Sequence, residues 1–204
     1  EDFNHARLIF LPKKPTGTLA GGTCYYAPEA TRPLPIVNTD NRLIAAAVKI
    51  NLHDTWESWI VQAQQGFLNG ISMNDNILQV EYYAQLSALQ ESEACTVLFD
   101  FKAAFPSIDY QFMWEALEGL GVPHSWVRAI KRFYKLNTQH LGAHRCVAMV
   151  GIRQGCPLSP LIFALVADVL LRKFTRVLGG RARVRAFATI RMPRARSAAA
   201  LGFV

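Results

Sequence analysis

The chain has 204 residues, of which 51% are hydrophobic and 11% aromatic, values that exclude an intrinsically disordered protein. A chain of this length can bury a substantial core in one or two domains, and it lacks the run of about 20 apolar residues that a membrane span requires. The net charge of +7 suggests a polyanionic partner, but residues 1–180 hold 16 Lys and Arg against 15 Asp and Glu. Residues 181–204 hold 6 Arg and no acid, so the basic excess comes almost wholly from this end.

The cysteines are Cys24, Cys95, Cys146 and Cys156, and they show none of the paired Cys or His spacings that a zinc site uses. They predict buried, reduced thiols in an intracellular protein, nuclear or cytoplasmic. The chain shows no secretory leader and begins with Glu1 rather than Met, so we expect it to be a piece of a longer protein.

The N-terminal segment predicts two extended stretches and a helix. Residues 6–14 predict a strand that ends in a basic turn, and residues 15–31, rich in Gly, Thr and Pro, predict a loop. Residues 32–37 should be extended, because a proline disfavours helix in the residue before it. Residues 38–40 read Asn-Thr-Asp and offer an N-cap to a helix over residues 42–52.

Two further helical stretches follow, separated by a glycine-rich interruption. Residues 56–64 predict a helix, which the stretch QGFLNG at residues 65–70 ends. Ser72 should cap a long helix over residues 74–92. The apolar positions of this helix predict a mostly buried stripe, formed by Ile77, Leu78, Val80, Tyr83, Leu86 and Leu89.

The middle of the chain predicts a buried strand, two helices and a hairpin strand. Residues 96–101 are almost wholly apolar, which is typical of a strand buried on both faces. Residues 110–119 and 125–136 predict amphipathic helices, parted by the stretch GLGVP at residues 119–123. Residues 145–150 predict a strand of a hairpin.

The last predicted helix has clear start and stop signals. Ser159 is an N-cap residue and Pro160 suits the first helical position, so a helix should run over residues 161–178 and stop at Gly179 and Gly180. Residues 181–204 differ in composition from everything before them. This change is the sharpest boundary in the chain.

Two segments carry chemistry, and the first is built around Asp100. Asp100 ends an apolar run and opens the stretch FKAAFP at residues 101–106. A carboxylate at the tip of a rigid strand supplies the hard oxygen ligand that Mg²⁺ prefers. Taken alone, an aspartate that ends a strand is more often a cap or turn residue than a metal ligand.

The second segment is the string RQGCPLSP at residues 153–160. Gly155 lets the backbone approach a base or a nucleotide closely and permits an unusual φ. The helix that follows Pro157 has an N-terminus that favours nearby phosphate charge. A plain strand-to-helix connection is the alternative for the glycine and proline, but no generic turn needs all eight residues.

These two segments, in this order, closely resemble the first two core motifs of the reverse transcriptases of non-LTR (LINE-type) retrotransposons. The resemblance covers residues 6–188 and includes LPKK at residues 11–14, RPLPIVNTDNR at residues 32–42 and QGFLNGIS at residues 65–72. It implies an RNA-directed DNA polymerase, which performs template-directed nucleotidyl transfer with two Mg²⁺. The implied partners are an RNA template, a DNA primer and dNTPs, with no membrane.

The fold that this resemblance implies is α+β, the right-hand polymerase architecture. Residues 1–180 would form a partial domain, with fingers at residues 1–93 and 110–150. The palm would take residues 94–109 and 151–180, with an incomplete sheet and no thumb. Residues 181–204 would be a separate Ala- and Arg-rich tail.

The resemblance also implies roles for individual residues. Asp100 would be the catalytic metal ligand. The nucleotide-binding residues would be Lys14, Arg32, Phe101, Phe105, Gln154 and Gly155, with Phe105 excluding a 2′-hydroxyl. The template and primer would meet Gly66, Phe67, Gly70, Ser72 and Pro157. Core packing remains the alternative for Phe105, and a solvated turn the alternative for Lys14.

The chain departs from the family pattern at two places. Ile71 stands where the family usually has Arg, which removes an expected template or phosphate contact. The third core motif should read aromatic-Ala-Asp-Asp, but the chain reads Phe187-Ala188-Thr189-Ile190. Asp168 is the last acid and lies inside a predicted helix, so one catalytic carboxylate of three remains and Mg²⁺ binding should be weak at most.

The broken third motif has an explanation in the genetic code. If Ala188, Thr189 and Ile190 are encoded GCG-ACG-AT(T/C/A), a shift by one base reads GAC-GAT, which is Asp-Asp. Our hypothesis is that a frameshift near residue 188 created the tail; a genuine, variable extension is the alternative. Two functions stay open: a polymerase, or a catalytically dead remnant with weak nucleic-acid binding. No feature of the sequence supports a third possibility, a structural protein that the host has adopted.

Overall fold

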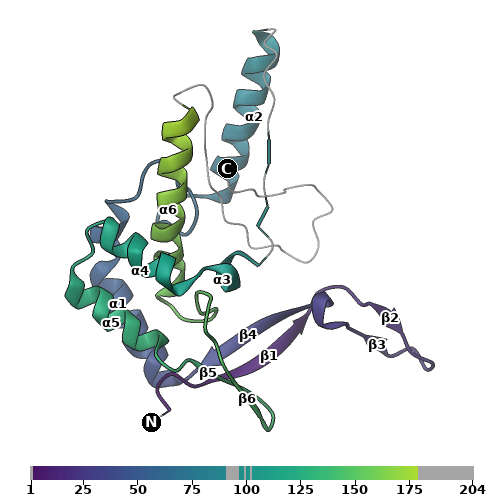
Figure 1. Ribbon diagram of the computed structural model, residues 1–204. Helices are drawn as coiled ribbons and strands as arrows, with labels where there is room; N and C mark the ends of the chain where they lie inside the picture. Colours follow the sequence, from purple (N-terminus) through teal and green to yellow (C-terminus); the bar gives the residue numbers. More distant parts are fainter. Residues whose placement is uncertain (1, 91–96, 99, 102, 179–204) are drawn as a thin grey trace. The chain divides into compact units, whose positions relative to one another are not determined.

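The computed structural model describes residues 2–90, 97–98, 100–101 and 103–178 (Figure 1). The chain divides into two compact units, residues 1–51 with 105–159 and residues 52–104 with 160–204. The structure is mixed α+β with a small mixed sheet, as the sequence predicts. The division into fingers and palm stays a prediction. Among the described residues, no helix combines the length and the apolar character needed to cross a membrane.

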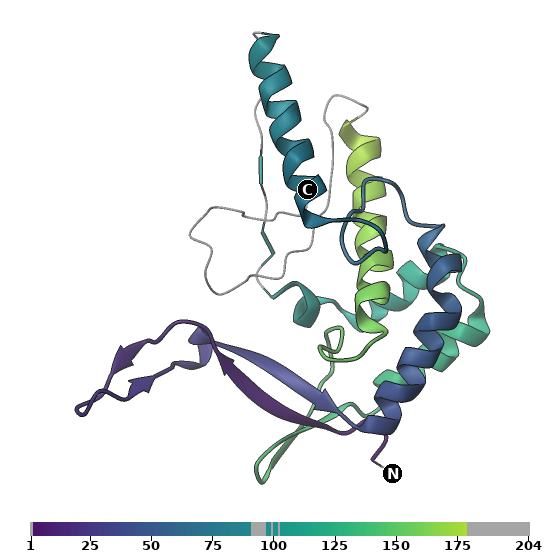
Figure 2. The ribbon, with the colours of Figure 1, turned by 180° about the vertical axis from the view of Figure 1, so that it is seen from behind.

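The first unit is built on a four-stranded sheet of order β4-β1-β5-β6. β1 (Ala6–Pro12) and β4 (Thr31–Val37) form a long antiparallel ribbon, with Ala6 opposite Val37 (Figure 2). Both strands match the predicted extended segments. β4 is an edge strand, which is where a strand tolerates proline because proline has no N–H to give to a neighbour.

The rest of this sheet joins segments far apart in the sequence. β5 (Thr138–Leu141) pairs in parallel with β1, with Ala6 opposite Gln139. β6 (His144–Val147) pairs antiparallel with β5, which confirms the predicted hairpin strand. The predicted loop at residues 15–31 contains a small hairpin of β2 (Gly17–Thr18) and β3 (Cys24–Tyr25) at the far end of the ribbon.

The predicted helices of the first unit are confirmed. α4 (Tyr110–Gly119) begins at Asp109, whose carboxylate accepts a hydrogen bond of 3.1 Å from the Phe112 amide. α5 (His124–Tyr134) follows, and a single turn, α3 (Ala104–Ser107), precedes α4. The core of the unit contains Met113, Leu117, Val127 and Ile130, all buried. α1 (Thr39–Glu57) starts in this unit and ends in the second.

The second unit contains α2 (Met73–Leu89) and most of α6 (Ser159–Leu178). Residues 161–168 of α6 are all buried, as expected for a helix that is apolar on every side. Asp168 is fully buried among them. Its carboxylate accepts hydrogen bonds of 2.9 Å from the Val61 amide and 2.6 Å from the Arg172 Nε. Arg172 also donates to the carbonyl of Trp59.

Three predictions about the second unit are wrong. The helix expected at residues 56–64 does not form: α1 ends at Glu57 and the chain turns. The side chains of Asp168 and Arg172 bind the Val61 amide and the Trp59 carbonyl, which holds this backbone in a non-helical path. The stripe of α2 that the sequence predicts to be mostly buried has no buried member: Leu78 and Leu89 are 65% and 82% exposed, Ile77 is exposed, and Val80, Tyr83 and Leu86 are half-buried.

The third wrong prediction concerns the buried strand at residues 96–101. Of these, 97, 98, 100 and 101 are described, and they lie outside any strand; Val97, Leu98 and Phe101 are about half exposed. A buried strand needs neighbours for its backbone, and no described strand pairs with this segment. Residues 96 and 99 lie outside the described residues.

The prediction of buried thiols holds for Cys156, but Cys24 and Cys146 are exposed because both lie on hairpin strands.

The Asp168 network predicts a large stability effect. Asp168→Ala removes a buried carboxylate and leaves the Val61 amide and the Arg172 Nε without the oxygens that accept from them, so the free energy of unfolding should fall by about 2 kcal/mol. Urea denaturation followed by circular dichroism measures it. Lys173→Ala, an exposed position on the same helix, is the control. Equal unfolding free energies for the two variants would contradict the network's role.

Candidate functional site

The loop between β6 and α6 is tied to the turn that carries Phe105. The Gly151 amide donates a 2.7 Å hydrogen bond to the Ile108 carbonyl, and the Ile152 amide donates a 2.7 Å hydrogen bond to the Phe105 carbonyl. Both bonds lie inside the first unit. The structure thus brings Phe105 and the segment before Gln154 together, although 46 residues separate Phe105 from Gly151.

Two glycines of this loop pack directly on backbone. Gly151 has a φ of +93°, and a Cβ there would lie 2.8 Å from the Cα and O of Pro106. Gly155 has a φ of +83°, and a Cβ there would lie 2.9 Å from the carbonyl oxygen of Pro35. A side chain at either place therefore meets both an unfavourable φ and a steric clash. The predicted close backbone approach at Gly155 is made here to β4.

A cavity of about 120 Å³ opens beside this loop. This volume is below the roughly 300 Å³ at which small-molecule pockets begin, so the cavity has room for part of a nucleotide rather than a whole one. Its lining combines apolar groups with the polar side chains of Asn137, Gln139, Arg153 and Gln154. The lining residues are Leu8, Pro33, Pro35, Pro106, Asn137, Gln139, Ala148, Val150, Gly151, Ile152, Arg153 and Gln154.

A buried polar cluster supports the loop. Arg153 is 3% exposed; its Nη2 donates to the Phe133 carbonyl, and its Cζ lies 5.7 Å from the centre of the Tyr134 ring. Its Nε and Nη1 have no hydrogen-bond partner among the described residues. Burial lowers the pKa of the Arg153 guanidinium, while the nearby Tyr134, Cys156 and Tyr110 act to raise it. Burial raises the pKa of both tyrosines, so they are neutral phenols at neutral pH.

The two cations predicted to meet the triphosphate lie on the β1–β4 ribbon. Arg32 is in β4 opposite Leu11, and Lys14 follows the end of β1 by two residues. Both side chains are exposed. They are therefore accessible to an anion from the same end of the ribbon. Pro157, predicted to meet the template, is half-buried in the loop before α6.

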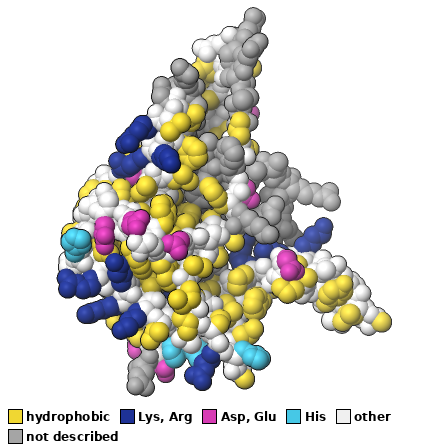
Figure 3. Space-filling view, in the orientation of Figure 1, with side chains coloured by type: hydrophobic (Ala, Val, Ile, Leu, Met, Phe, Trp, Pro, Cys, Tyr) yellow, Lys and Arg dark blue, Asp and Glu magenta, His cyan; other side chains and the backbone are white. Residues whose placement is uncertain are grey.

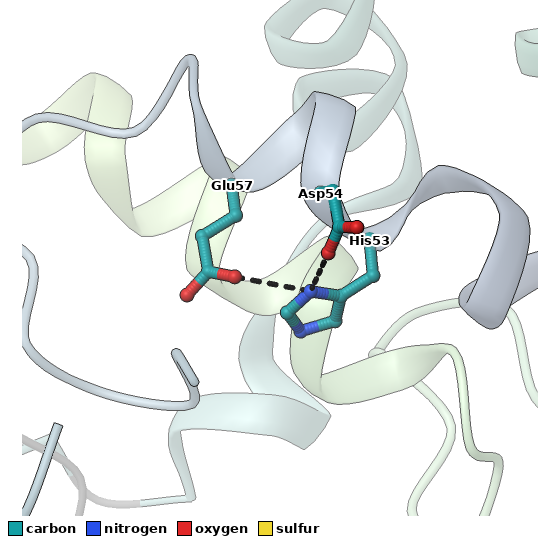
Figure 4. Close-up of side chains that lie close together, drawn as sticks. All are labelled: His53, Asp54 and Glu57. Carbon is teal, nitrogen blue, oxygen red and sulfur yellow. Dashed lines mark ion pairs between the residues drawn. The ribbon is translucent and has the colours of Figure 1, made fainter. Parts of the chain in front are cut away.

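The segment predicted to meet template and primer belongs to the second unit, where it is fastened to the end of α1. Glu57 accepts a 2.7 Å hydrogen bond from the Asn69 amide, and its carboxylate lies 3.0 Å from the His53 Nδ1. Figure 4 shows this Nδ1 facing the carboxylates of Glu57 and Asp54, the latter at 3.6 Å. The ligand atoms of the three side chains lie within 4.8 Å of one another, close enough for one metal ion to meet all three. However, all three residues come from one stretch of helix and Asp54 is 98% exposed. We therefore interpret the cluster as a set of contacts that attaches the loop at Asn69 to the end of α1.

Within this segment, local structure accounts for several predicted residues. Ser72 is the N-cap of α2, as predicted, and its Oγ accepts a 3.1 Å hydrogen bond from the Asn74 amide. Gly66 is buried, and Gly70 has a φ of +71°. The ring of Phe67 packs edge-on against Phe163, with the centroids 5.9 Å apart.

Asp100 and Phe101 are exposed and belong to the second unit. Among the described residues, Asp100 belongs to no group of three or more His, Cys, Asp or Glu side chains that could hold a metal ion. The described donor set therefore does not fit a two-metal centre. Residues 187–190, where the other two carboxylates would stand, lie outside the described residues.

Sequence reasoning overlooked three buried polar residues. Arg153 and Asn137 line the cavity, and Asp168 organises the second unit. For Arg153 the available signal was a cation inside a string of apolar residues and glycines. For Asp168 it was an acid in an apolar helix with Arg172 four residues later. Asn137 had no signal, because its burial depends on tertiary packing.

Comparisons with known proteins agree on one family. The family model described as reverse transcriptase (RNA-dependent DNA polymerase) matches residues 11–188. The chain is 27% identical, over 183 residues, to the Pol polyprotein of the type-2 retrotransposable element R2DM of Drosophila melanogaster, covering 86% of this chain and 16% of that protein. It is 26% identical over 140 residues to a reverse transcriptase-like protein of Chlamydomonas reinhardtii, covering 69% of this chain and 37% of that one.

A protein of transposon TX1 of Xenopus laevis is 25% identical over 155 residues, covering 70% of this chain and 12% of that protein. The chain thus spans between 12% and 37% of the length of these relatives.

The packing of Gly155 predicts a steric effect beyond backbone strain. Gly155→Ala should lower the free energy of unfolding by about 2 kcal/mol more than Gly21→Ala, whose φ of +103° is comparably strained but whose Cβ would meet nothing within 4 Å. Urea denaturation of both variants measures the difference. If the two variants lose the same stability, the close approach of Gly155 to Pro35 is not a constraint on the fold.

Proposed function

The chain belongs to the reverse transcriptase family, with a domain of the non-LTR retrotransposon type, and from this we propose that its function is RNA-templated DNA synthesis. The substrates would be deoxynucleoside triphosphates, an RNA template and a DNA primer. Domains of this family generally depend on divalent metal ions.

The hydrogen bond between the Ile152 amide and the Phe105 carbonyl is the observation that carries this proposal. It joins the two motif segments beside a cavity that Gln154 lines. In this arrangement Gln154 and Gly155 would position the template base pair. Phe105 would pack under the incoming sugar and exclude a 2′-hydroxyl.

The charged residues would act on the substrate's phosphates. Lys14 and Arg32 are fixed cations on one ribbon, and an arginine can grip phosphate oxygens in a bidentate way. Asp100 would supply one hard oxygen ligand to Mg²⁺. Since Thr189 and Ile190 stand where the two acids are expected, we propose that Mg²⁺ binds weakly at most.

The end of the family match supports the frameshift proposal. The match stops at residue 188, and residues 189–204 lie beyond it. Sequencing genomic DNA and transcript across the codons for residues 187–191 tests the proposal. We expect one extra base whose insertion restores Phe-Ala-Asp-Asp; Phe-Ala-Thr-Ile in both reads would contradict a frameshift.

Nucleic-acid binding without polymerisation is the second candidate function, and the charge on α5 favours it. Figure 3 shows lysine and arginine side chains gathered over this helix. The exposed cations of this region are Arg128, Lys131, Arg132 and Lys135. Lys131 is partly engaged, since its Nζ lies 3.5 Å from Glu118. Such a strip is the electrostatic footprint of phosphate binding.

Polymerisation and charge-driven binding separate in one experiment. Primer extension on an RNA template with Mg²⁺ is measured for the chain, for Thr189→Asp/Ile190→Asp, and for that variant with Asp100→Asn added. We expect extension only where the two acids are restored and Asp100 is present, because each carboxylate supplies part of the ligand set. Extension that survives Asp100→Asn would contradict the role of this residue.

Binding of an RNA–DNA hybrid, followed by fluorescence anisotropy, completes the test. Four cations that each neutralise one phosphate predict an affinity loss of about 100-fold between about 50 and 200 mM salt. Asp100→Asn should leave this affinity unchanged, whereas Arg128→Ala with Arg132→Ala should roughly halve the salt slope. Lys173→Ala is the control. An affinity that does not change with salt concentration would exclude charge-driven binding through α5.

A further inference from the structure

We propose that Arg153 is a positioning residue for Gln154 and Gly155, and that its guanidinium clamps their loop to the C-terminal end of α5. Its value for template binding rests on the proposed function. The clamp itself rests on the geometry of the first unit alone.

Arg153 is a buried cation without a carboxylate partner. It is 3% exposed, and among the described residues no acid lies within ion-pair distance of it. A buried charge is unfavourable unless other groups compensate it. The compensation must therefore come from groups other than a carboxylate, and the structure shows which ones.

The end of α5 supplies this compensation. Phe133 lies in the last turn of the helix, and its carbonyl is one of those that have no partner within a helix. The C-terminal end of a helix also carries partial negative charge, which stabilises a cation. Arg153 donates to this carbonyl, and the ring of Tyr134 lies near the guanidinium. Arg153 thereby gives one carbonyl of the helix end a donor, while its own Nε and Nη1 have no hydrogen-bond partner among the described residues.

Arg153 directly precedes Gln154 in the chain, so its contact with α5 also fixes the backbone position of Gln154. On one side the loop is held by the amides of Gly151 and Ile152, and on the other Gly155 abuts Pro35. Arg153 is the anchor between these two, directly before the residue proposed to contact the base pair. Without it, the backbone at Gln154 would be held only at its two flanks.

The chemistry of the contact requires arginine. The planar guanidinium can donate in its own plane to the Phe133 carbonyl while it remains weakly hydrated beside an aromatic ring. A lysine ammonium is a compact and strongly hydrated charge, and it is disfavoured in such a buried place. Arg153→Lys therefore keeps the charge but should lose the clamp.

Hydrogen exchange in the 204-residue chain tests the clamp without any assay of activity. In Arg153→Lys we expect the amides of Gly151 and Ile152 to exchange about tenfold faster, while those of α4 change less than about twofold. Arg145→Lys, an exposed position on β6, should change neither. Unchanged exchange in the loop, equal acceleration throughout α4, or loss of folding in Arg153→Lys would each overturn the proposal.

Hybrid binding then connects the clamp to function. Arg153→Lys should weaken binding of the RNA–DNA hybrid about tenfold, because the loop that carries Gln154 is no longer held in place. The salt dependence of the affinity should stay the same, because a buried cation neutralises no phosphate. A reduced slope would make Arg153 a direct phosphate contact and overturn the positioning role. If the unmodified chain does not bind the hybrid, the proposed function fails, while the exchange experiment still decides the clamp.

Discussion

The hydrogen bonds from Gly151 and Ile152 to the carbonyls of Ile108 and Phe105 are the constraint on which the rest of the first unit depends. α3 is only four residues long, so the carbonyls at its end have no helical partners of their own. The glycine loop supplies the missing donors. These hydrogen bonds pair backbone groups of both segments and place the two sequence motifs beside one cavity.

Two buried charges organise the molecule, and each is compensated differently. In the second unit the Asp168 carboxylate accepts from a backbone amide and from Arg172, which gives it both hydrogen bonds and an opposite charge. In the first unit Arg153 has no acid beside it and donates to the end of α5. Both side chains reach backbone more than fifteen residues away in the sequence, and both hold irregular segments that lack the ladder of a helix or sheet.

Local signals in the sequence predicted much of the fold. The proline-rich strand β4, the capped helices α2 and α4, and the hairpin strand β6 form where the residues alone placed them. In each of these the decisive interaction is short in sequence, such as Ser72 with Asn74. The failures have the opposite origin. The expected helix at residues 56–64 is overridden by side chains of α6, and no residue of the stripe on α2 is buried, because burial needs a covering surface.

The sequence by itself determined the family and predicted the site residues, because the string at residues 153–160 and the position of Asp100 are statements about residue order alone. It also determined that the third motif lacks its two acids. Only the tertiary structure decided that Gly155 abuts β4, that the Gln154 loop is tied to Phe105, and that Arg153 is buried against α5. These contacts join residues 20 to 120 positions apart in the sequence, and such pairings follow from how the whole chain packs.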